Sequence, residues 1–195
     1  MKPIALPMPT PRGTPAPFAV SQAALDARLL GVYASKSLRR TLRGAVKLNL
    51  PALAARATEE LADSASGADV KLHADPMTIH ERLVRGLPGQ ALFVSSALAF
   101  ESLQEALPFF EVSAKTAWEK LETTLTASQS EQALRLGRVA TRAAELFASA
   151  EAGRRYLKTP NFALGGATPL ELLRTAQGEQ LVLAELQSQD AGGPV

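Results

Sequence analysis

The segment Tyr156–Leu173, with the sequence YLKTPNFALGGATPLELL, constrains the fold more than any other part of the chain. Pro160 has no backbone N–H and pushes Thr159 out of the α region, so a helix running through Arg154–Leu157 is expected to end here. The two consecutive glycines that follow permit a tight turn. The segment therefore predicts a helix stop and a loop within a few residues.

A second helix is predicted directly after this loop. Thr168 is placed as its N-cap, Pro169 occupies the first helical position, and Glu171 stands three residues after the cap. This spacing is that of a capping box, in which the two side chains satisfy each other's backbone N–H groups. We expect a short helix from about Pro169 to Arg174. The pattern indicates an interaction surface and contains no catalytic motif.

The composition favours an all-α fold. The chain has 195 residues and is 46% hydrophobic, which suffices for one medium domain or two small ones. Aromatic residues make up only 5%, while Ala and Leu abound, so helices should pack through small and aliphatic side chains. No cysteine is present, which excludes disulfides, thiolate metal sites and a cysteine nucleophile and suits a reducing compartment. We expect a cytoplasmic protein.

No membrane span is expected, because the apolar run near Ala91–Phe100 is interrupted by Ser95 and Ser96 and is too short for a hydrocarbon layer of ~30 Å. Residues 1–20 contain six prolines and cannot form the apolar helix of a secretory signal. We expect them to be a solvated, polyproline-like arm.

Charge is distributed unevenly along the chain. Residues 1–50 hold eight Lys and Arg against one acid, Asp26, whereas residues 51–195 hold thirteen against eighteen. The basic part has three interpretations: a nucleic-acid-contacting arm, an organellar transit segment, or a solvated helix face. If DNA is bound, four cations within nine residues are the best phosphate contacts: Arg39, Arg40, Arg43 and Lys47.

Three helices are expected in the basic half, and Asp63–Ala74 reads as a linker rich in Ser, Ala and Gly. The first runs from a Ser21 cap through Tyr33, the second from Ser37 to Lys47, and the third from Pro51 to about Asp63. We divide the chain into an arm (1–20), a basic helical extension (21–68), a helix-turn-helix region (75–127) and a C-terminal domain (128–195).

Capping patterns predict the next helices. Thr78 with Glu81 indicates a helix through about Leu87, and another helix should begin at Gln90. Ser102–Trp118 has the spacing of a helix-turn-helix, with Pro108–Val112 as the connection and Ser113 as the second cap.

The C-terminal part should begin with a long helix. Ser128 and Glu131 form a third predicted capping box, and an apolar stripe from Leu136 to Phe147 follows at helical spacing. A last helix is expected after Gly178, and a short flexible tail closes the chain.

These residues resemble a known family. Residues 147–195 are similar to the C-terminal toxin-binding domain of the Xre/MbcA/ParS antitoxins, and a looser similarity to that family's helix-turn-helix region extends back to about Asp75. The matching positions are Thr159, Pro160, Asn161, Ala163, Leu164, Gly165, Gly166, Thr168, Pro169, Leu172, Leu173, Thr175 and Gly178.

The resemblance implies an antitoxin whose C-terminal domain occludes the active site of a RES-domain toxin that degrades NAD. It also implies dimerisation within a larger hetero-oligomer and repression of the antitoxin's own operon. The candidate toxin contacts, some of which could instead be core, are Leu157, Thr159, Pro160, Asn161, Phe162, Leu164, Gly165, Gly166, Thr168, Leu170, Leu173, Val182, Leu186, Gly193, Pro194 and Val195.

DNA contacts by the second helix of the helix-turn-helix would come from Lys115, Thr116 and Lys120. This helix is neutral overall, so it gains little from phosphate neutralisation and could instead be a packing or dimerisation unit with Trp118 buried. The alternatives to an antitoxin are therefore a stand-alone helix-turn-helix regulator and an interaction adaptor without DNA binding.

Catalysis has little support in the sequence. His73 and His80 are the only histidines, and neither has an evident base or metal partner. The Gly165-Gly166 loop could receive an anion, but it lacks the ending of a P-loop and is better interpreted as a turn and partner contact. We expect no enzyme, no metal site and no cofactor.

Overall fold

The computed structural model describes residues 21–44, 49–66 and 75–192, and the fold within these ranges is all-α, as predicted. No strand occurs in these ranges beyond one isolated antiparallel bridge between Pro88 and Thr124. The helices are α1 (Gln22–Tyr33), α2 (Lys36–Gly44), α3 (Leu50–Ser66), α4 (Pro76–Arg85), α5 (Gln90–Ala99), α6 (Leu103–Phe110), α7 (Ala114–Lys120), α8 (Ala127–Leu146), α9 (Ala150–Lys158), the 3-10 turn η1 (Phe162–Leu164), α10 (Pro169–Leu172) and α11 (Ala176–Asp190).

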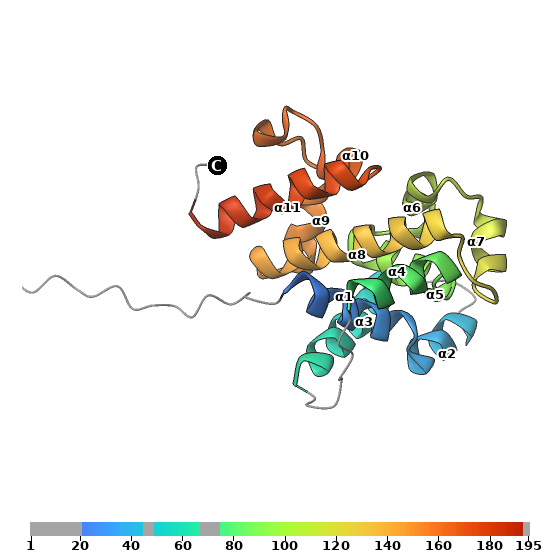
Figure 1. The fold of residues 1–195 in the computed structure, drawn as a ribbon. Coiled ribbons are helices and arrows are strands. Elements are labelled where there is room, and N and C mark those ends of the chain that lie inside the picture. The colour runs from blue at the N-terminus through green and yellow to red at the C-terminus, as the bar shows by residue number, and fades with distance from the viewer. Residues whose placement is uncertain (1–20, 45–48, 67–74, 193–195) are drawn as a thin grey trace, which may run out of the picture.

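The long helix α8 is the centre of the molecule. It packs against α1, α4, α5, α9 and α11, so its side chains are buried on several faces (Figure 1). The predicted apolar stripe is buried from Leu136 to Ala143, whereas Phe147 follows the helix end and is 36% exposed. The core thus joins helices from all parts of the described chain.

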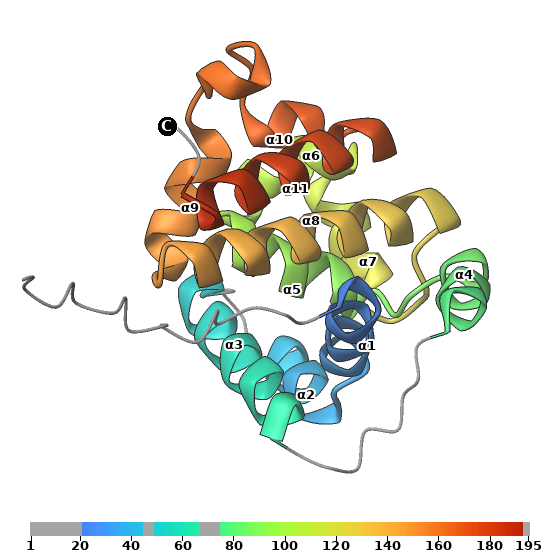
Figure 2. The same cartoon turned by 60° about the vertical axis from the view of Figure 1, so that its left-hand side comes forward.

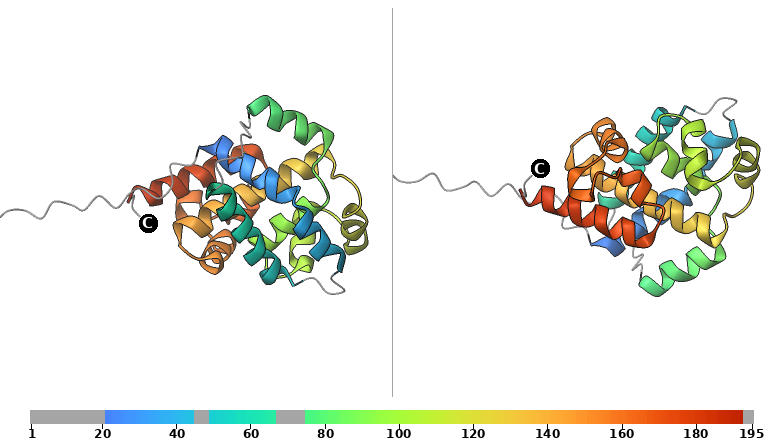
Figure 3. Two further views of the ribbon diagram at one scale, coloured as in Figure 1. Left: turned by 90° about the horizontal axis from the view of Figure 1, so that it is seen from below. Right: turned by 90° about the horizontal axis from the view of Figure 1, so that it is seen from above.

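Helices α1–α3 lie on one side of the α5 and α8 layer, and α9–α11 lie on the other (Figure 2). In the view from below, α1 and α3 lie in front (Figure 3, left). In the view from above, α10 and α11 lie in front (Figure 3, right). Ser21 caps α1 as predicted, and Leu53, Ala57 and Leu61, which lie at fourfold spacing on α3, are buried. The arm 1–20 and Lys47 lie outside the described residues, and α3 continues three residues beyond the predicted boundary at Asp63.

Two of the three predicted capping boxes are wrong. Helix α4 begins at Pro76, after Asp75, so Thr78 and Glu81 lie inside it and form no box. Helix α8 begins two residues earlier than predicted, because Thr126 and Gln129 form the capping box that Ser128 and Glu131 were expected to form. In both cases the helix begins before the residues that were predicted to form its capping box.

Two short helices, α6 and α7, lie where the helix-turn-helix was predicted, but the turn between them is shorter than expected. Pro108 lies within α6, which continues to Phe110, and the connection is confined to Glu111–Ser113. Ser113 caps α7 as expected, since its hydroxyl accepts the N–H of Thr116 at 3.1 Å. Trp118 is 36% exposed and its ring packs at a tilt against that of Phe93, with ring centroids 5.0 Å apart, so it is not the buried residue that the packing interpretation required.

The last helix begins before Gly178. Thr175 is its N-cap and accepts the N–H of Gly178 at 3.0 Å. A Cβ atom on Gly178 would lie 1.9 Å from the carbonyl oxygen of Leu172, so glycine is required where α11 leaves α10. No helix in the described ranges is long and apolar enough to cross a membrane, and no cluster of His, Asp and Glu there could hold a metal ion.

Candidate functional site

One asparagine organises the loop between α9 and α10. The carbonyl oxygen of Asn161 accepts the N–H groups of Leu164 (3.0 Å) and Gly166 (2.9 Å). Its side-chain oxygen accepts the N–H of Ala163 at 2.8 Å, and its own N–H donates to Ala167 at 3.1 Å. Most backbone polar groups of the loop are therefore satisfied internally, which gives the loop a fixed shape.

The two glycines complete this shape. Gly165 and Gly166 have φ angles of 69° and 84°, in the left-handed region that residues with a Cβ rarely adopt. No atom outside the immediate neighbours lies within 4 Å of a Cβ built on either glycine, so the loop projects into open space. The glycines are thus needed for backbone conformation and not for close packing.

Phe162 is the most exposed large hydrophobic residue in the described chain. It opens η1 at the projecting loop, and 99% of its surface is accessible. A fully exposed phenylalanine on a fixed loop gains nothing for folding, yet it could bury a large apolar area against a partner.

Helix α11 supplies a second exposed apolar residue beside this loop. The side chain of Asn161 reaches Glu185 at 3.5 Å, and η1 packs on α11. Leu181 lies one turn before Glu185 on the same helix face and is 51% exposed. The sequence analysis did not include Leu181 among the contacts, because its position beside the buried Val182 does not show from the sequence which of the two faces outward.

The structure sorts the sequence candidates into interior and surface residues. Leu157, Leu173 and Val182 are fully buried and Leu186 is 4% exposed, so these four belong to the core and offer no surface to a partner. Thr159, Pro160, Gly165 and Gly166 are exposed, Asn161, Leu164, Thr168 and Leu170 are partly buried, and residues 193–195 lie outside the described ranges.

The capping box of α10 is confirmed. The N–H of Thr168 donates to the Glu171 carboxylate at 2.8 Å, and the N–H of Glu171 donates to the Thr168 hydroxyl at 3.2 Å. The hydrogen bond from the Thr168 backbone holds the pKa of Glu171 below its usual value.

Tyr156 lies in α9, one residue before the buried Leu157. Burial raises the pKa of Tyr156 to about 12, and its ring lies 5.3 Å from that of Phe147.

A buried cluster of ion pairs joins α1, α8 and α11. Arg138 of α8 donates to both carboxylate oxygens of Asp26 in α1, at 2.8 and 2.9 Å, and also pairs with Glu179 in α11. Glu179 lies 3.5 Å from Arg135, which donates to the carbonyl oxygen of Leu173 at 3.1 Å. Desolvation opposes the charge of Arg138, but its two carboxylate partners dominate and raise its pKa.

A comparison with protein families identifies this part of the chain. Residues 142–192, roughly a quarter of the sequence, match the family described as the antitoxin Xre/MbcA/ParS C-terminal toxin-binding domain. The chain carries a toxin-binding domain of this antitoxin family. The matched range begins in the last turns of α8, includes α9, the Phe162 loop, α10 and α11, and ends at the last described residue. No curated protein shows significant similarity to the chain.

The predicted DNA contacts that the structure describes come from two elements, α2 and α7. Arg43 of α2 forms two hydrogen bonds with Glu122, at 3.0 and 2.7 Å, so its charge is partly neutralised. Arg40 is exposed, Arg39 is half-buried, and Lys47 is outside the described residues. On α7, Lys115 lies 3.8 Å from Glu119, while Thr116 and Lys120 are partly buried.

Proposed function

We propose that this antitoxin belongs to a type II toxin–antitoxin pair and occludes the active site of a RES-type, NAD-degrading toxin. The observation that carries the proposal is the fully exposed Phe162 on a fixed loop of the toxin-binding domain. The RES-type identity is supported by the family resemblance of the segment that contains this loop. The proposal includes two copies of the chain within the complex.

Phe162 and Leu181 are the anchors in this proposal. Burial of a phenylalanine side chain contributes about 1.5–3 kcal/mol, and a few such residues dominate most interfaces. The Asn161 hydrogen bonds fix the loop before binding, so little conformational entropy is lost on association. The tail, residues 193–195, would lie over the mouth of the toxin's NAD pocket.

The test is capture of the toxin encoded beside this gene. Phe162→Ala should weaken the complex by roughly 30-fold, the equivalent of about 2 kcal/mol, without changing the stability of the free antitoxin. Met77→Ala is the matched control, because Met77 is 60% exposed but lies in α4 outside the matched domain. Equal affinities of the two variants would exclude the loop as an anchor.

The identity of the toxin is tested separately, by its chemistry. Expression of the neighbouring toxin alone should deplete cellular NAD, and co-expression of the antitoxin should restore it. Removal of residues 192–195 should keep capture but lose part of this protection. Full protection by the truncated chain would show that the tail does not block the pocket.

Operator binding is a second candidate function, and one contact favours it. The ion pair between Arg43 and Glu122 joins the end of α2 to the residues directly after α7, so basic residues of the two helices lie on neighbouring parts of the surface. Arg40 is exposed there and forms no ion pair within the described ranges. A DNA-binding surface formed by α2 and α7 together would carry the positive charge that α7 alone lacks.

The second candidate is tested with DNA from upstream of the gene. The chain should retard it, and log affinity should fall linearly with log salt concentration. Arg40→Gln should reduce this slope by about 0.9, the value for one lost phosphate contact. Arg155→Gln, a change to an exposed arginine in α9, should leave the slope unchanged. Retained toxin capture without any retardation would support the adaptor alternative.

A further inference from the structure

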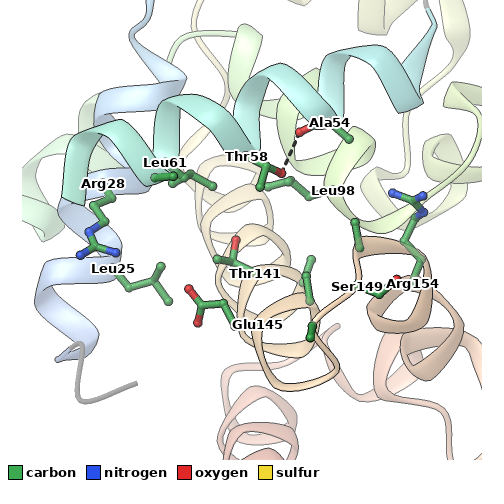
Figure 4. Close-up of a pocket in the computed structure, with 15 residues that line it drawn as sticks. Leu25, Arg28, Ala54, Thr58, Leu61, Leu98, Thr141, Glu145, Ser149 and Arg154 are labelled. Carbon is green, nitrogen blue, oxygen red and sulfur yellow. Dashed lines mark hydrogen bonds between the residues drawn. The ribbon is translucent and has the colours of Figure 1, made fainter. Parts of the chain in front are cut away.

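A pocket of about 470 Å³ lies between α1, α3, α8 and α9 (Figure 4). Apolar side chains of Ala and Leu form most of its wall, including Leu25, Leu61, Leu98 and Ala144. Its size falls within the usual range for small-molecule sites. It joins the basic helices of the N-terminal half to the toxin-binding domain, and it is separate from the Phe162 loop.

Polar residues interrupt this apolar wall at a few points: Arg28, Thr58, Thr141, Glu145, Ser149 and Arg154. Two of them, Thr141 and Arg154, also have a buried side-chain atom without a hydrogen-bond partner, Oγ1 and Nε. Their polar side chains are thus not fully satisfied within the described chain. An apolar wall with a few convergent polar groups is typical of a ligand site.

The charges around the pocket favour an anion. Arg28 and Arg154 line it, and neither forms an ion pair with any carboxylate in the described chain. Glu145 is the one acid in the described lining, and it already lies 3.6 Å from Arg142. Burial raises the pKa of Glu145, with the two arginines opposing this, so the carboxyl is more easily protonated than usual.

We propose that this pocket binds a medium-chain aliphatic carboxylate. Its alkyl chain would lie along the apolar wall of α3 and α8, and its carboxylate would accept hydrogen bonds from the guanidinium of Arg154, which lines the pocket without an ion-pair partner among the described residues. Charge-assisted bonds from arginine to carboxylate are among the strongest available to a small ligand. The N-terminal arm is a poorer occupant, because residues 1–20 carry Lys2 and Arg12 and no acid.

The proposal is tested by calorimetric titration of the unaltered full chain with decanoate, decanol and decylammonium. These three probes share one alkyl chain and differ in the charge of the head group. Decanoate should bind at least about tenfold more tightly than decanol, the effect of one charge-assisted interaction, and decylammonium should bind least. Equal binding of the three, or none, would overturn the proposal. Toxin capture does not enter this measurement.

Variants then locate the head group. Arg154→Gln should reduce decanoate binding to the level of decanol, whereas Arg155→Gln, its exposed neighbour in α9, should leave it unchanged. Because the chain has no cysteine, Phe18→Cys with Ala62→Cys at the pocket reports on the arm. Efficient disulfide formation in the double variant, together with no decanoate binding by the unaltered chain, would identify the arm as the occupant and overturn the proposal.

Discussion

At the scale of single residues, the contact between α1 and α8 depends on a glycine. The Tyr33 hydroxyl donates to the carbonyl oxygen of Ala133 at 2.9 Å and is fully buried. A Cβ atom on Gly137 would lie 2.1 Å from this hydroxyl oxygen and 3.3 Å from a methyl group of Leu29. The side chain of Tyr33 therefore occupies the space that any other residue at 137 would need.

Gly137→Ala should lower the free energy of unfolding by about 2 kcal/mol, because the added methyl displaces a buried ring and its hydrogen bond. Urea denaturation measures the change. Gly31→Ala is the matched control: Gly31 is an exposed position inside α1 with no atom near its Cβ, and alanine should stabilise the chain by up to about 1 kcal/mol. Changes of the same sign at the two glycines would contradict the packing argument.

At the scale of elements, helix α10 has only four residues and depends on its cap. Thr168→Ala removes the hydroxyl that accepts the N–H of Glu171 and should cost about 1 kcal/mol of stability. Thr168→Ser keeps this hydroxyl and should cost much less. Urea denaturation of the three proteins decides between them, and equal losses for serine and alanine would mean that the methyl group matters and the cap does not.

This same cap shows which parts of the fold are readable from sequence. Thr168 with Glu171 was predictable because Pro160 follows the end of α9 and two glycines follow the turn η1, so no earlier start was available. Thr78 with Glu81 has the same pattern, but Asp75 and Pro76 start that helix sooner. Local patterns identify helices and fix their ends only where a breaker stands nearby.

Exposure and long-range contacts were not readable in this way. Leu157 and Phe162 both lie in the segment with the family motif, yet one is fully buried and the other is 99% exposed. This difference is set by packing on α8 and α11, which periodicity does not resolve over so short a stretch. Asp26 and Arg138 are 112 residues apart in the sequence, so no local sequence pattern predicts that they form an ion pair.

At the scale of the whole molecule, the ion cluster makes the N-terminal helices and the toxin-binding domain parts of one folded unit. Arg138 in α8 holds Asp26 of α1 on one side and Glu179 of α11 on the other. All three side chains are at most 15% exposed, and α1, α8 and α11 meet around them. We expect Trp118 fluorescence and helical circular dichroism to report a single, coincident unfolding transition.

Asp26→Asn tests this unity. The change leaves the buried Arg138 with one carboxylate in place of two, and breaking a buried pair in this way costs about 3–5 kcal/mol. The single transition should move to lower urea concentration for both probes together. If α1 instead formed an independent unit, the circular dichroism curve would develop an early step while the transition of Trp118, which packs on Phe93 of α5, stayed in place.

The double variant Asp26→Leu, Arg138→Met separates charge from packing. Replacing both partners by apolar side chains of similar volume leaves no unpaired buried charge between α1 and α8, and such replacements are commonly neutral or stabilising. Glu179 also remains paired, because Arg135 lies 3.5 Å from its carboxylate. We therefore expect the double variant to recover most of the stability lost in Asp26→Asn. A double variant as unstable as the single one would show that the ion pair itself, and not the satisfaction of Arg138, holds the two halves of the chain together.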